Sequence, residues 1–305
     1  MKRAIITGAT GAIGTALIEE LISNNVEILI LARKQSKRIC NVATHPLVKI
    51  IECSMDGYQS LDRISDTDYD IFYHLAWEGT IGAERNDMYL QNRNVKHSLD
   101  AVNLAKRFGC KRFIGAGSQA EYGRFNGELT PFTPVFPEMG YGFAKLCAGQ
   151  MTRGYANQIG IEHIWVRILS VYGPYDGSQS MVMSTINKFM NNEIPKLTKG
   201  EQEWDFLFSR DAAKALFLIG NHGINEKTYV LGNGTTKTIK EYVEIIRNIV
   251  APDIVPDYGV IPYAEKQVMY LKSDISELKN DTGWTPQTEF SDGIKEILKR
   301  YNNDA

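Results

Sequence analysis

The 305-residue chain contains few cysteines and no long apolar run. Its cysteines, Cys40, Cys53, Cys110 and Cys147, stand far apart and lack the close pairs of a zinc site or a redox motif. We therefore expect no metal site and four reduced thiols that fill buried space. The apolar run near the N-terminus is too short for a signal peptide or a membrane span. These absences predict a soluble, cytoplasmic protein with no membrane partner.

An excess of charge of either sign is also missing. The chain has 34 basic and 36 acidic residues, and no basic block stands out. Nucleic acids and anionic membranes both attract clustered positive charge, so this balance gives neither of them support as a partner. With 43% hydrophobic residues the chain can bury a large core, which predicts one large domain or two closely packed ones. A small-molecule partner fits this balance of charge better than a nucleic acid or an anionic membrane does.

What the sequence does contain begins with a glycine turn. An apolar run at residues 4–6 leads into this turn, and a segment with helical spacing of apolar residues follows at 16–22. The order strand, turn, helix presents unpaired backbone N–H groups and the positive end of the helix dipole to a pyrophosphate. The glycines are spaced three and three, unlike the better known fingerprint, and the alternative is that they only make a turn. The residues that we predict to bind the cofactor here are Gly8, Thr10, Gly11, Ala12, Ile13 and Gly14.

Strand patterns then alternate with helical patterns, which is typical of parallel βαβ units and an α/β doubly wound parallel sheet. The further predicted strands cover residues 26–31, 48–52, 71–75 and 112–116. The predicted helices cover residues 58–64, 84–108 and 141–158. Ligands of such sheets bind at the carboxyl ends of the strands, where His74 lies. We expect His74 to be a packed, hydrogen-bonded residue, because histidine becomes catalytic only through positioned partners.

No acidic residue follows the second predicted strand. In a dinucleotide fold an acid there binds the ribose 2′-hydroxyl, whereas an arginine accommodates a 2′-phosphate. Here four cations fall within residues 33–38. We therefore predict a preference for NADP(H), with NAD(H) as the alternative, and assign Arg33, then Lys34 and Ser36, to the phosphate. The competing interpretation is a solvated basic loop.

A tyrosine and a lysine, Tyr141 and Lys145, lie four residues apart and so on one face of a predicted helix. A phenol with a pKa of about 10 is a poor acid-base group at neutral pH, but a nearby ammonium and a cationic nicotinamide favour the phenolate and lower that pKa. Ser118, at a strand end, can hydrogen-bond the same substrate oxygen. Together with the glycine turn, these residues predict a site for hydride transfer.

These features resemble the short-chain dehydrogenase/reductase superfamily, and specifically its extended branch that acts on nucleotide sugars. The resemblance runs over nearly the whole chain. The matching motifs are Thr7-Gly8-x-x-Gly11-x-x-Gly14, His74-Leu75-Ala76, Asn94-Val95, Ser118-x-x-x-Tyr122-Gly123, Tyr141-x-x-x-Lys145, the run from Arg167 to Pro174, Asp205-Phe206, Asp211, and Thr282-Gly283-Trp284-x-Pro286.

The resemblance implies a Rossmann-type NAD(P)-binding domain of residues 1–171 and 205–231, and a smaller nucleotide-sugar lobe of residues 172–204 and 232–305. In relatives two helices of the first domain form a homodimer, which is the expectation here. We also expect the helices at 239–250 and 274–301 to cover the smaller lobe.

The resemblance further implies a role for each matching residue. Tyr141 would be the acid-base residue, Lys145 would lower its pKa and hold the nicotinamide ribose, and Ser118 would anchor the substrate oxygen. Leu75 and Ala76 would contact the cofactor. The substrate-binding residues that it implies are Trp77, Ser118, Gln119, Tyr141, Ser170, Val171 and Trp204.

Departures from the family pattern narrow the chemistry. Family dehydratases place Asp-Glu directly after the hydroxyl residue, whereas Gln119 and Ala120 cannot transfer those protons. Ala120 also replaces the cysteine of the enzymes that invert carbons beside the ketone. The usual substrate-contacting Asn and Arg are Ser170 and Trp204 in this chain, so the nucleotide and the sugar stay open.

Two enzymatic outcomes remain. The basic loop favours an NADPH-dependent reductase of a nucleotide-linked 4-keto-6-deoxyhexose, in deoxysugar and surface polysaccharide biosynthesis. The alternative is an NAD-dependent nucleotide-sugar 4-epimerase, which oxidises and re-reduces the same sugar. A catalytically silent NADP-binding sensor is a third hypothesis, and the intact Ser118, Tyr141 and Lys145 argue against it.

Overall fold

The computed structural model describes residues 1–34, 36–63 and 68–304, and side chains as far as residue 300. Gln35 in the predicted basic loop and Ile64 in the predicted short helix lie outside the described residues.

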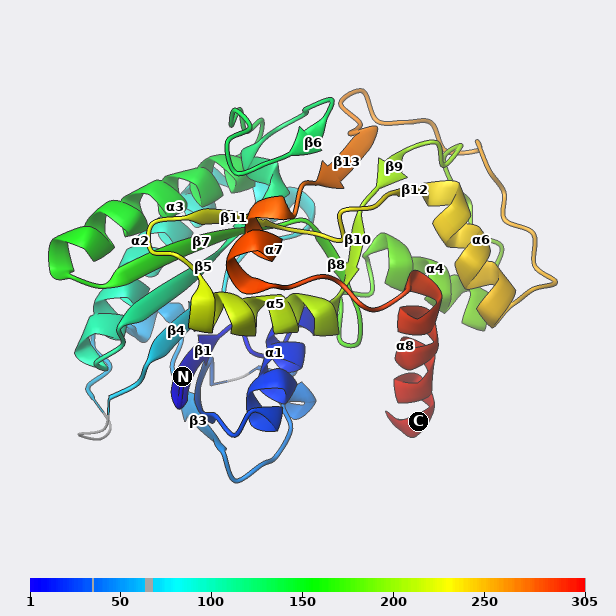
Figure 1. Cartoon of the computed structure of the whole chain (residues 1–305). Helices are drawn as coiled ribbons and strands as arrows, with labels where there is room; N and C mark the ends of the chain where they lie inside the picture. The colour runs from blue at the N-terminus through cyan, green and yellow to red at the C-terminus, as the bar shows by residue number, and fades with distance from the viewer. Residues whose placement is uncertain (35, 64–67, 305) are drawn as a thin grey trace.

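A seven-stranded sheet forms the centre of the molecule (Figure 1). Its strands stand in the order β11-β7-β5-β4-β1-β2-β3, and every neighbouring pair is parallel. The strands are β1 (Arg3–Thr7), β2 (Glu27–Ala32), β3 (Val48–Glu52), β4 (Ile71–His74), β5 (Arg112–Ser118), β7 (Glu162–Ile168) and β11 (Thr228–Leu231). The predicted doubly wound α/β sheet is confirmed. Its strand order reverses between β1 and β4, which is where a crevice for a ligand opens in such sheets.

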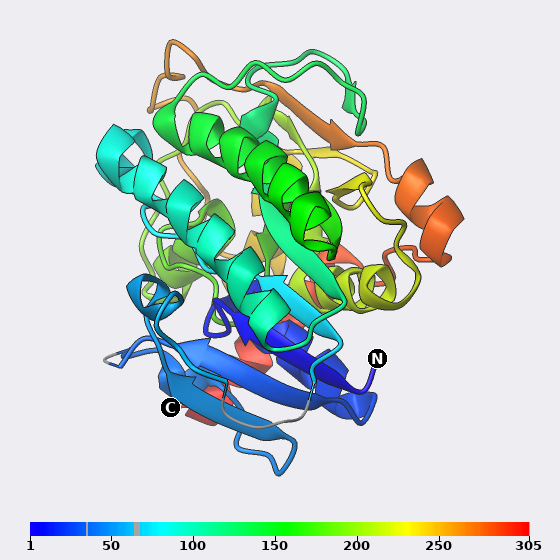
Figure 2. The same cartoon turned by 90° about the vertical axis from the view of Figure 1, so that its left-hand side faces the viewer.

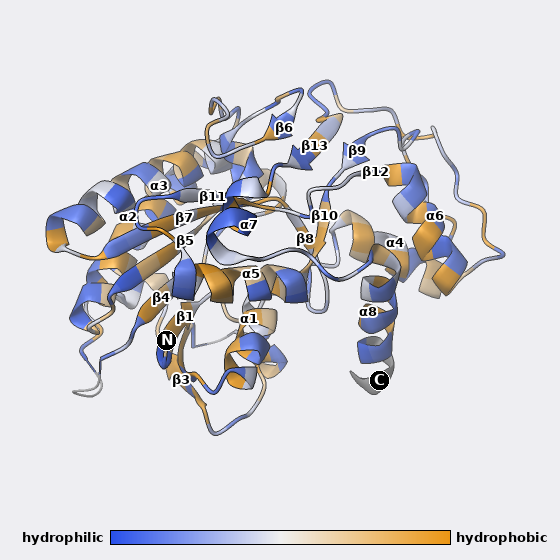
Figure 3. Cartoon of the chain, viewed as in Figure 1, coloured by the Kyte–Doolittle hydropathy of each residue, from blue (hydrophilic) through white to orange (hydrophobic). Residues whose placement is uncertain are grey.

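Two helices cover each face of this sheet. α1 (Ala12–Ser23) and α5 (Ser209–His222) pack together on one face, and α2 (Met88–Arg107) and α3 (Gly140–Ile159) pack together on the other, which is turned toward the viewer in Figure 2. Helices α1 and α5 each carry an apolar and a polar side, because only one side faces the sheet (Figure 3). The four helices therefore bury both faces of the sheet and leave its strand ends free for a site.

The segment after β3 differs from the predicted helix at 58–64. A 3₁₀ turn, η2 (Met55–Gly57), precedes it, and residues 58–63 form turns and irregular backbone. The ring of Tyr58 is buried edge-on against His74, with 6.2 Å between the ring centroids. The Arg107 guanidinium donates to the carbonyls of Tyr58 and Leu61, which a helix would have used for its own backbone hydrogen bonds. Long-range contacts thus replace the bonds that a helix would have made.

A second lobe lies beside the carboxyl ends of the strands, on the right of Figure 1. It holds two small sheets, β10-β8 and β12-β9-β13-β6, and a separate apolar core. Its strands are β6 (Glu128–Leu129), β8 (Ser170–Tyr172), β9 (Glu203–Trp204), β10 (Phe206–Phe208), β12 (Lys237–Thr238) and β13 (Tyr270–Ser273). Its helices are α4 (Met181–Met190), α6 (Ile239–Val250) and α8 (Phe290–Asp304). The predicted helix at 239–250 is confirmed.

The predicted helical region at 274–301 contains two helices that pack in different places. α8 joins the core of the second lobe through Ile294 and Ile297. α7 (Ser276–Thr282) instead packs against α5 and β11, and its Leu278 belongs to the core of the central sheet, as does Trp284. The expectation that both helices cover the second lobe is therefore wrong for α7.

The cysteines also differ from expectation. Cys110 is buried, but Cys53 is only partly buried, and Cys40 and Cys147 are exposed. Cys147 lies on the outer side of α3, away from the sheet that would have covered it. Within the described residues, no cluster of His, Cys, Asp and Glu has the makings of a metal site. None of the helices described is both long and apolar enough to cross a bilayer.

Candidate functional site

The glycine turn joins β1 to α1 at the crevice. Gly8 has φ of 73°, and a Cβ atom there would lie 2.6 Å from the backbone of Leu75 and Ala76 at the end of β4. A Cβ on Gly14 would lie 2.4 Å from the Gly8 carbonyl oxygen. Gly11 caps α1 without a side-chain hydrogen bond and faces open space. The first turn of α1 thus has a bare N-terminus that fits a pyrophosphate.

Two cavities adjoin at this turn. The larger cavity has a volume of about 800 Å³ and the smaller one about 560 Å³, and Gly8, Leu75 and Trp77 line both. The other predicted residues of the larger cavity are Gly11, Ala12, Ile13, Gly14, Ser118, Gln119, Tyr141, Lys145, Ser170, Val171 and Trp204. The other predicted residues of the smaller cavity are Thr10, Arg33, Ser36 and Ala76. The fold therefore gathers residues from distant segments around one continuous crevice.

Lys34 is the predicted site residue that lines neither of these two cavities. It lines a separate pocket with Glu52 and Ser54, beside β3. Arg33 and Ser36 line the smaller cavity instead, and the Ser36 backbone N–H donates to the Arg33 carbonyl at 3.1 Å. Of the described cations that follow β2, Arg33 is thus the one that lines the crevice.

Lys145 lies beneath the larger cavity with only 4% of its surface exposed. Its Nζ donates to the Ala116 carbonyl at 2.6 Å and lies 3.7 Å from the centroid of a Trp77 ring. Burial lowers the pKa of Lys145 to about 7, although the Glu121 carboxylate opposes this shift. A cation–π contact and one strong hydrogen bond therefore hold an ammonium group that water no longer solvates.

Tyr141 opens onto the larger cavity from the first turn of α3. Burial raises the pKa of Tyr141, and a hydrogen bond with Ser118 and the Arg85 guanidinium act in the opposite direction. The Arg85 guanidinium carbon lies 4.6 Å from the centroid of the phenol ring, closer than Lys145 Nζ at 5.7 Å. Within the protein itself, desolvation thus outweighs the nearby cations, and the lowering of this pKa expected beside a cationic nicotinamide stays a prediction.

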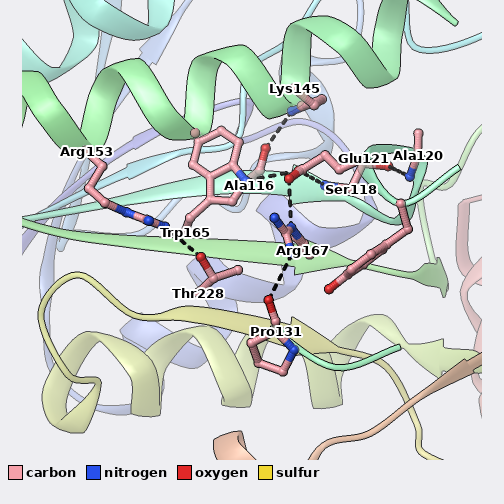
Figure 4. A network of polar contacts seen from close by, with 12 residues as sticks. Ala116, Ser118, Ala120, Glu121, Pro131, Lys145, Arg153, Trp165, Arg167 and Thr228 are labelled. Atoms are coloured by element: carbon pink, nitrogen blue, oxygen red, sulfur yellow. Dashed lines mark hydrogen bonds and ion pairs between the residues drawn. The ribbon is translucent and has the colours of Figure 1, made fainter. Parts of the chain in front are cut away.

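A buried ion pair lies under Ser118 (Figure 4). The Glu121 side chain is fully buried, and its Oε1 accepts from the Ser118 backbone N–H at 2.8 Å and from the Trp165 indole at 3.0 Å. Its Oε2 accepts from Arg167 Nε at 2.8 Å. Ser118 and Glu121 form a capping box around the 3₁₀ turn η4 (Gln119–Glu121), and this pair fixes the backbone of Ser118. Sequence reasoning missed Glu121, although the Ser-x-x-Glu spacing signals such a box.

Two of the departures from the family pattern, Ser170 and Trp204, contact each other. The Trp204 indole N–H donates to Ser170 Oγ at 2.8 Å, which joins β9 to β8 at the wall of the larger cavity. The two substitutions therefore form one local arrangement instead of two separate losses.

Other polar residues of the crevice have structural partners. Asn94 is buried in α2 and pins the loop after β4 through two hydrogen bonds to the Glu78 backbone, at 3.0 and 2.9 Å. His74 bonds Thr7 Oγ1 at 2.9 Å and Ser98 Oγ at 3.3 Å, and burial lowers its pKa to about 3. The interpretation of His74 as a packed, hydrogen-bonded residue is confirmed.

The larger cavity also includes residues that the sequence did not single out. Arg85 enters from the 3₁₀ turn η3 (Gly82–Asn86), and Lys196, Thr198 and Gln202 enter from the second lobe. No local pattern marks these positions, because each depends on how a loop folds back onto the sheet.

Comparison with known proteins places this geometry in context. The family model described as the NAD dependent epimerase/dehydratase family matches residues 4–232. A CDP-abequose synthase of Salmonella typhimurium is 26% identical over 307 residues, with 97% of each chain covered. A putative UDP-glucose 4-epimerase of Methanocaldococcus jannaschii is 24% identical over 312 residues, with 98% of each covered.

Solved structures share the fold. The structure of a UDP-N-acetylglucosamine 4-epimerase from Methanobrevibacter ruminantium, in complex with UDP-N-acetylmuramic acid, superposes with a TM-score of 0.88 at 22% identity. The comparison covers 100% of this chain and 99% of that one.

Proposed function

The chain belongs to the NAD-dependent epimerase/dehydratase family, and we propose that it is an NADPH-dependent reductase of a nucleotide-linked 4-keto-6-deoxyhexose. The observation that carries the reductase assignment is the pair Arg33 and Ser36 at the smaller cavity. They follow β2, where the adenosine ribose of a dinucleotide lies in this fold, and a guanidinium there suits a 2′-phosphate. The product would be a deoxysugar for surface polysaccharide, made in the cytoplasm.

The residues of the glycine turn and of the smaller cavity fit such a dinucleotide. The bare N-terminus of α1 suits its pyrophosphate, and the close approach at Gly8 and Gly14 leaves no room for side chains in between. When bound, the dinucleotide supplies the hydride. Lys145 lines the larger cavity, where its ammonium can turn from Ala116 to a ribose hydroxyl.

The proton in this reaction comes from Tyr141. As a hydride reaches C4 of the sugar, negative charge develops on the carbonyl oxygen, and the phenol donates its proton there to give the alcohol. The Ser118 hydroxyl polarises the same oxygen by hydrogen bonding. Tyr141 and Ser118 both line the larger cavity, and the Ser118 hydroxyl acts to lower the pKa of the phenol, which supports a common target for both groups.

The second lobe would hold the nucleotide sugar. We propose residues 172–204 and 232–305 as this lobe, to which β6, β8 and β10 add strands, and residues 1–171 and 205–231 as the dinucleotide domain, against which α7 packs. Support comes from the larger cavity, since Lys196, Gln202 and Ile261 of the second lobe face Tyr141 of the first domain across it. The Glu121 carboxylate beside Ser118 gives no support to water elimination, because both of its oxygens are engaged by buried donors.

The 4-epimerase alternative is favoured by one contact. The Arg38 guanidinium, in the loop after β2, donates to the Tyr175 carbonyl in the loop after β8. A link between these two loops suits an enzyme that keeps its NAD bound through the reaction. Replacing Arg38 with alanine would then speed cofactor loss, whereas a reductase, which exchanges cofactor at each turnover, would gain or keep activity.

The deciding experiment compares cofactors and turnover in one preparation. The purified protein is tested for thermal stabilisation by NADP(H) and NAD(H), and then for NADPH oxidation with CDP-, dTDP-, GDP- and UDP-linked 4-keto-6-deoxyhexoses. We expect selective stabilisation by NADPH and one NADPH oxidised per sugar reduced. Tightly retained NAD, with C4 inversion and no net cofactor consumption, would overturn the reductase in favour of the epimerase.

We also propose a homodimer formed through α2 and α3. The outer side of α3 exposes Phe143, Cys147 and Met151, an apolar stripe on a helix that otherwise packs well. Sedimentation analysis would measure a dimer, and charge introduced by Met151→Glu would convert it to monomer. A monomeric wild-type protein would refute this proposal.

A further inference from the structure

The Arg85 side chain lies against the ring of Tyr141 in the larger cavity. Its guanidinium carbon is 4.6 Å from the ring centroid, and Nη1 donates to the Thr80 carbonyl at 3.4 Å. Its Nε is buried, and within the described part of the chain it has no hydrogen-bond partner. Most of the guanidinium is thus left free to act on the phenol or on a molecule bound beside it.

The loop that carries Arg85 is fixed to the helix that carries Tyr141. Asn86 Oδ1 accepts from the Gly140 backbone N–H at 3.0 Å, and so supplies the cap that the Met139 side chain does not provide. A Cβ on Gly140 would lie 3.2 Å from the Arg85 carbonyl oxygen, which shows how closely the segments approach. Gln91 Nε2 also donates to the Glu84 carbonyl at 3.0 Å. The position of Arg85 over the ring is therefore built into the fold.

The charged and polar groups around Tyr141 come from four elements. Ser118 of β5 and Arg85 of η3 act to lower the pKa of the phenol, and the negative charge of Glu121 of η4 acts to raise it. Lys145 of α3 lies farther from the ring, at 5.7 Å, and donates to Ala116. A guanidinium also keeps its charge at every working pH, whereas burial lowers the pKa of Lys145 to about 7. Arg85 is thus the constant positive charge beside this phenol.

We propose that Arg85 is a positioning residue that acts through Tyr141, by holding the ring in place and stabilising the phenolate. This inference rests on the proposed role of Tyr141 as proton donor. When the phenol gives its proton to the sugar oxygen, the O–H bond breaks and a negative charge stays on the phenolate. Arg85 lies over the ring that carries that charge and lowers the free energy of the state in which the proton has moved.

The first test needs no substrate. The absorbance of tyrosinate is titrated with pH in the ligand-free protein, and the same titration of its Tyr141→Phe variant is subtracted to isolate one phenol among 15. We expect Arg85→Met to move the midpoint of this difference to higher pH and Arg85→Lys to restore part of the shift. Arg93→Met, which removes an exposed arginine of α2, is the matched control and should leave the midpoint unchanged. An unchanged midpoint in Arg85→Met would overturn the proposal.

The second test is a double-mutant cycle on turnover, and it also serves if the phenol ionises only above the pH at which the protein unfolds. We expect Arg85→Met to reduce kcat about tenfold in the wild-type background and to have no effect in the Tyr141→Phe background, because the arginine acts through the phenol. Equal losses in both backgrounds would show that Arg85 acts on the substrate itself. If no nucleotide sugar is turned over, the proposed function fails, whereas the titration still decides the role of Arg85.

Discussion

The larger and smaller cavities are assembled in different ways. The smaller one is built mainly from the segments that follow β1, β2, β3 and β4, which are neighbours in the sheet. The larger one takes side chains from β5, α3, η3, β8 and the second lobe, over a span from Gly8 to Gln267. A dinucleotide needs mainly a bare helix N-terminus and close packing, whereas proton transfer needs side chains held by partners far away in the sequence. Mutations in the larger cavity should therefore change turnover, whereas mutations in the smaller cavity should change cofactor binding.

The largest difference between the effect on turnover and the effect on NADPH binding is expected from Tyr141→Phe. This change removes the phenol of the larger cavity and leaves the walls of the smaller one intact. We expect turnover to fall by about 10²–10⁴-fold, because one positioned general acid contributes that much. NADPH affinity, measured by fluorescence titration, should stay within about twofold of wild type. Retained turnover would refute the role of Tyr141.

The next largest effect is expected at the buried ion pair under Ser118. Glu121→Leu leaves Arg167 buried without its partner, and we expect the free energy of unfolding to drop by about 3–5 kcal/mol. The double variant Glu121→Leu/Arg167→Leu should recover much of that stability in denaturant unfolding, because no unpaired charge is left.

Turnover of the same two variants shows whether Glu121 positions Ser118 or only stabilises the fold. The double variant still lacks the acceptor for the Ser118 backbone N–H, so its turnover should stay low although its stability recovers. A double variant that regains both would mean that Glu121 only stabilises the fold.

A smaller effect is expected at the far end of the smaller cavity. Arg33→Ala/Ser36→Ala removes the groups assigned to a 2′-phosphate, and we expect about tenfold weaker NADPH binding with NADH binding unchanged. Lys34→Ala is the matched control, since Lys34 lines neither cavity. Equal weakening of NADPH and NADH would contradict the assignment, as would a large effect of the control.

A pH-dependent effect on stability tests whether the larger cavity excludes water from Lys145. Its pKa falls from an ordinary value of 10.5 to about 7 on folding, so between these values the unfolded chain binds more protons than the folded one. Stability conferred at this residue is therefore lowest below pH 7 and rises as the pH increases toward 10.5. The unfolding free energy of the wild type, measured relative to that of Lys145→Met, should therefore increase as the pH rises across this window. A flat difference would show that water reaches the ammonium.

The periodicity of the sequence predicted the central sheet, the glycine turn and the helix at 239–250 correctly, because strands, turns and amphipathic helices depend on neighbouring residues. It failed over 58–63, where Arg107 binds the carbonyls that a helix would have used. The expectation that Cys40 and Cys147 are buried also failed, since the spacing of cysteines says nothing about which side of a helix or loop faces water.

The sequence by itself determined which chemical groups are available: a glycine turn, a cation after β2, and the trio Ser118, Tyr141 and Lys145. Tertiary structure alone decided their surroundings. It brought Arg85 onto the ring of Tyr141, buried Glu121 under Ser118, and turned Lys34 away from the crevice. The physical reason is that the pKa values and positions of these groups depend on burial and on charges from distant segments, and only the packed chain brings those segments together.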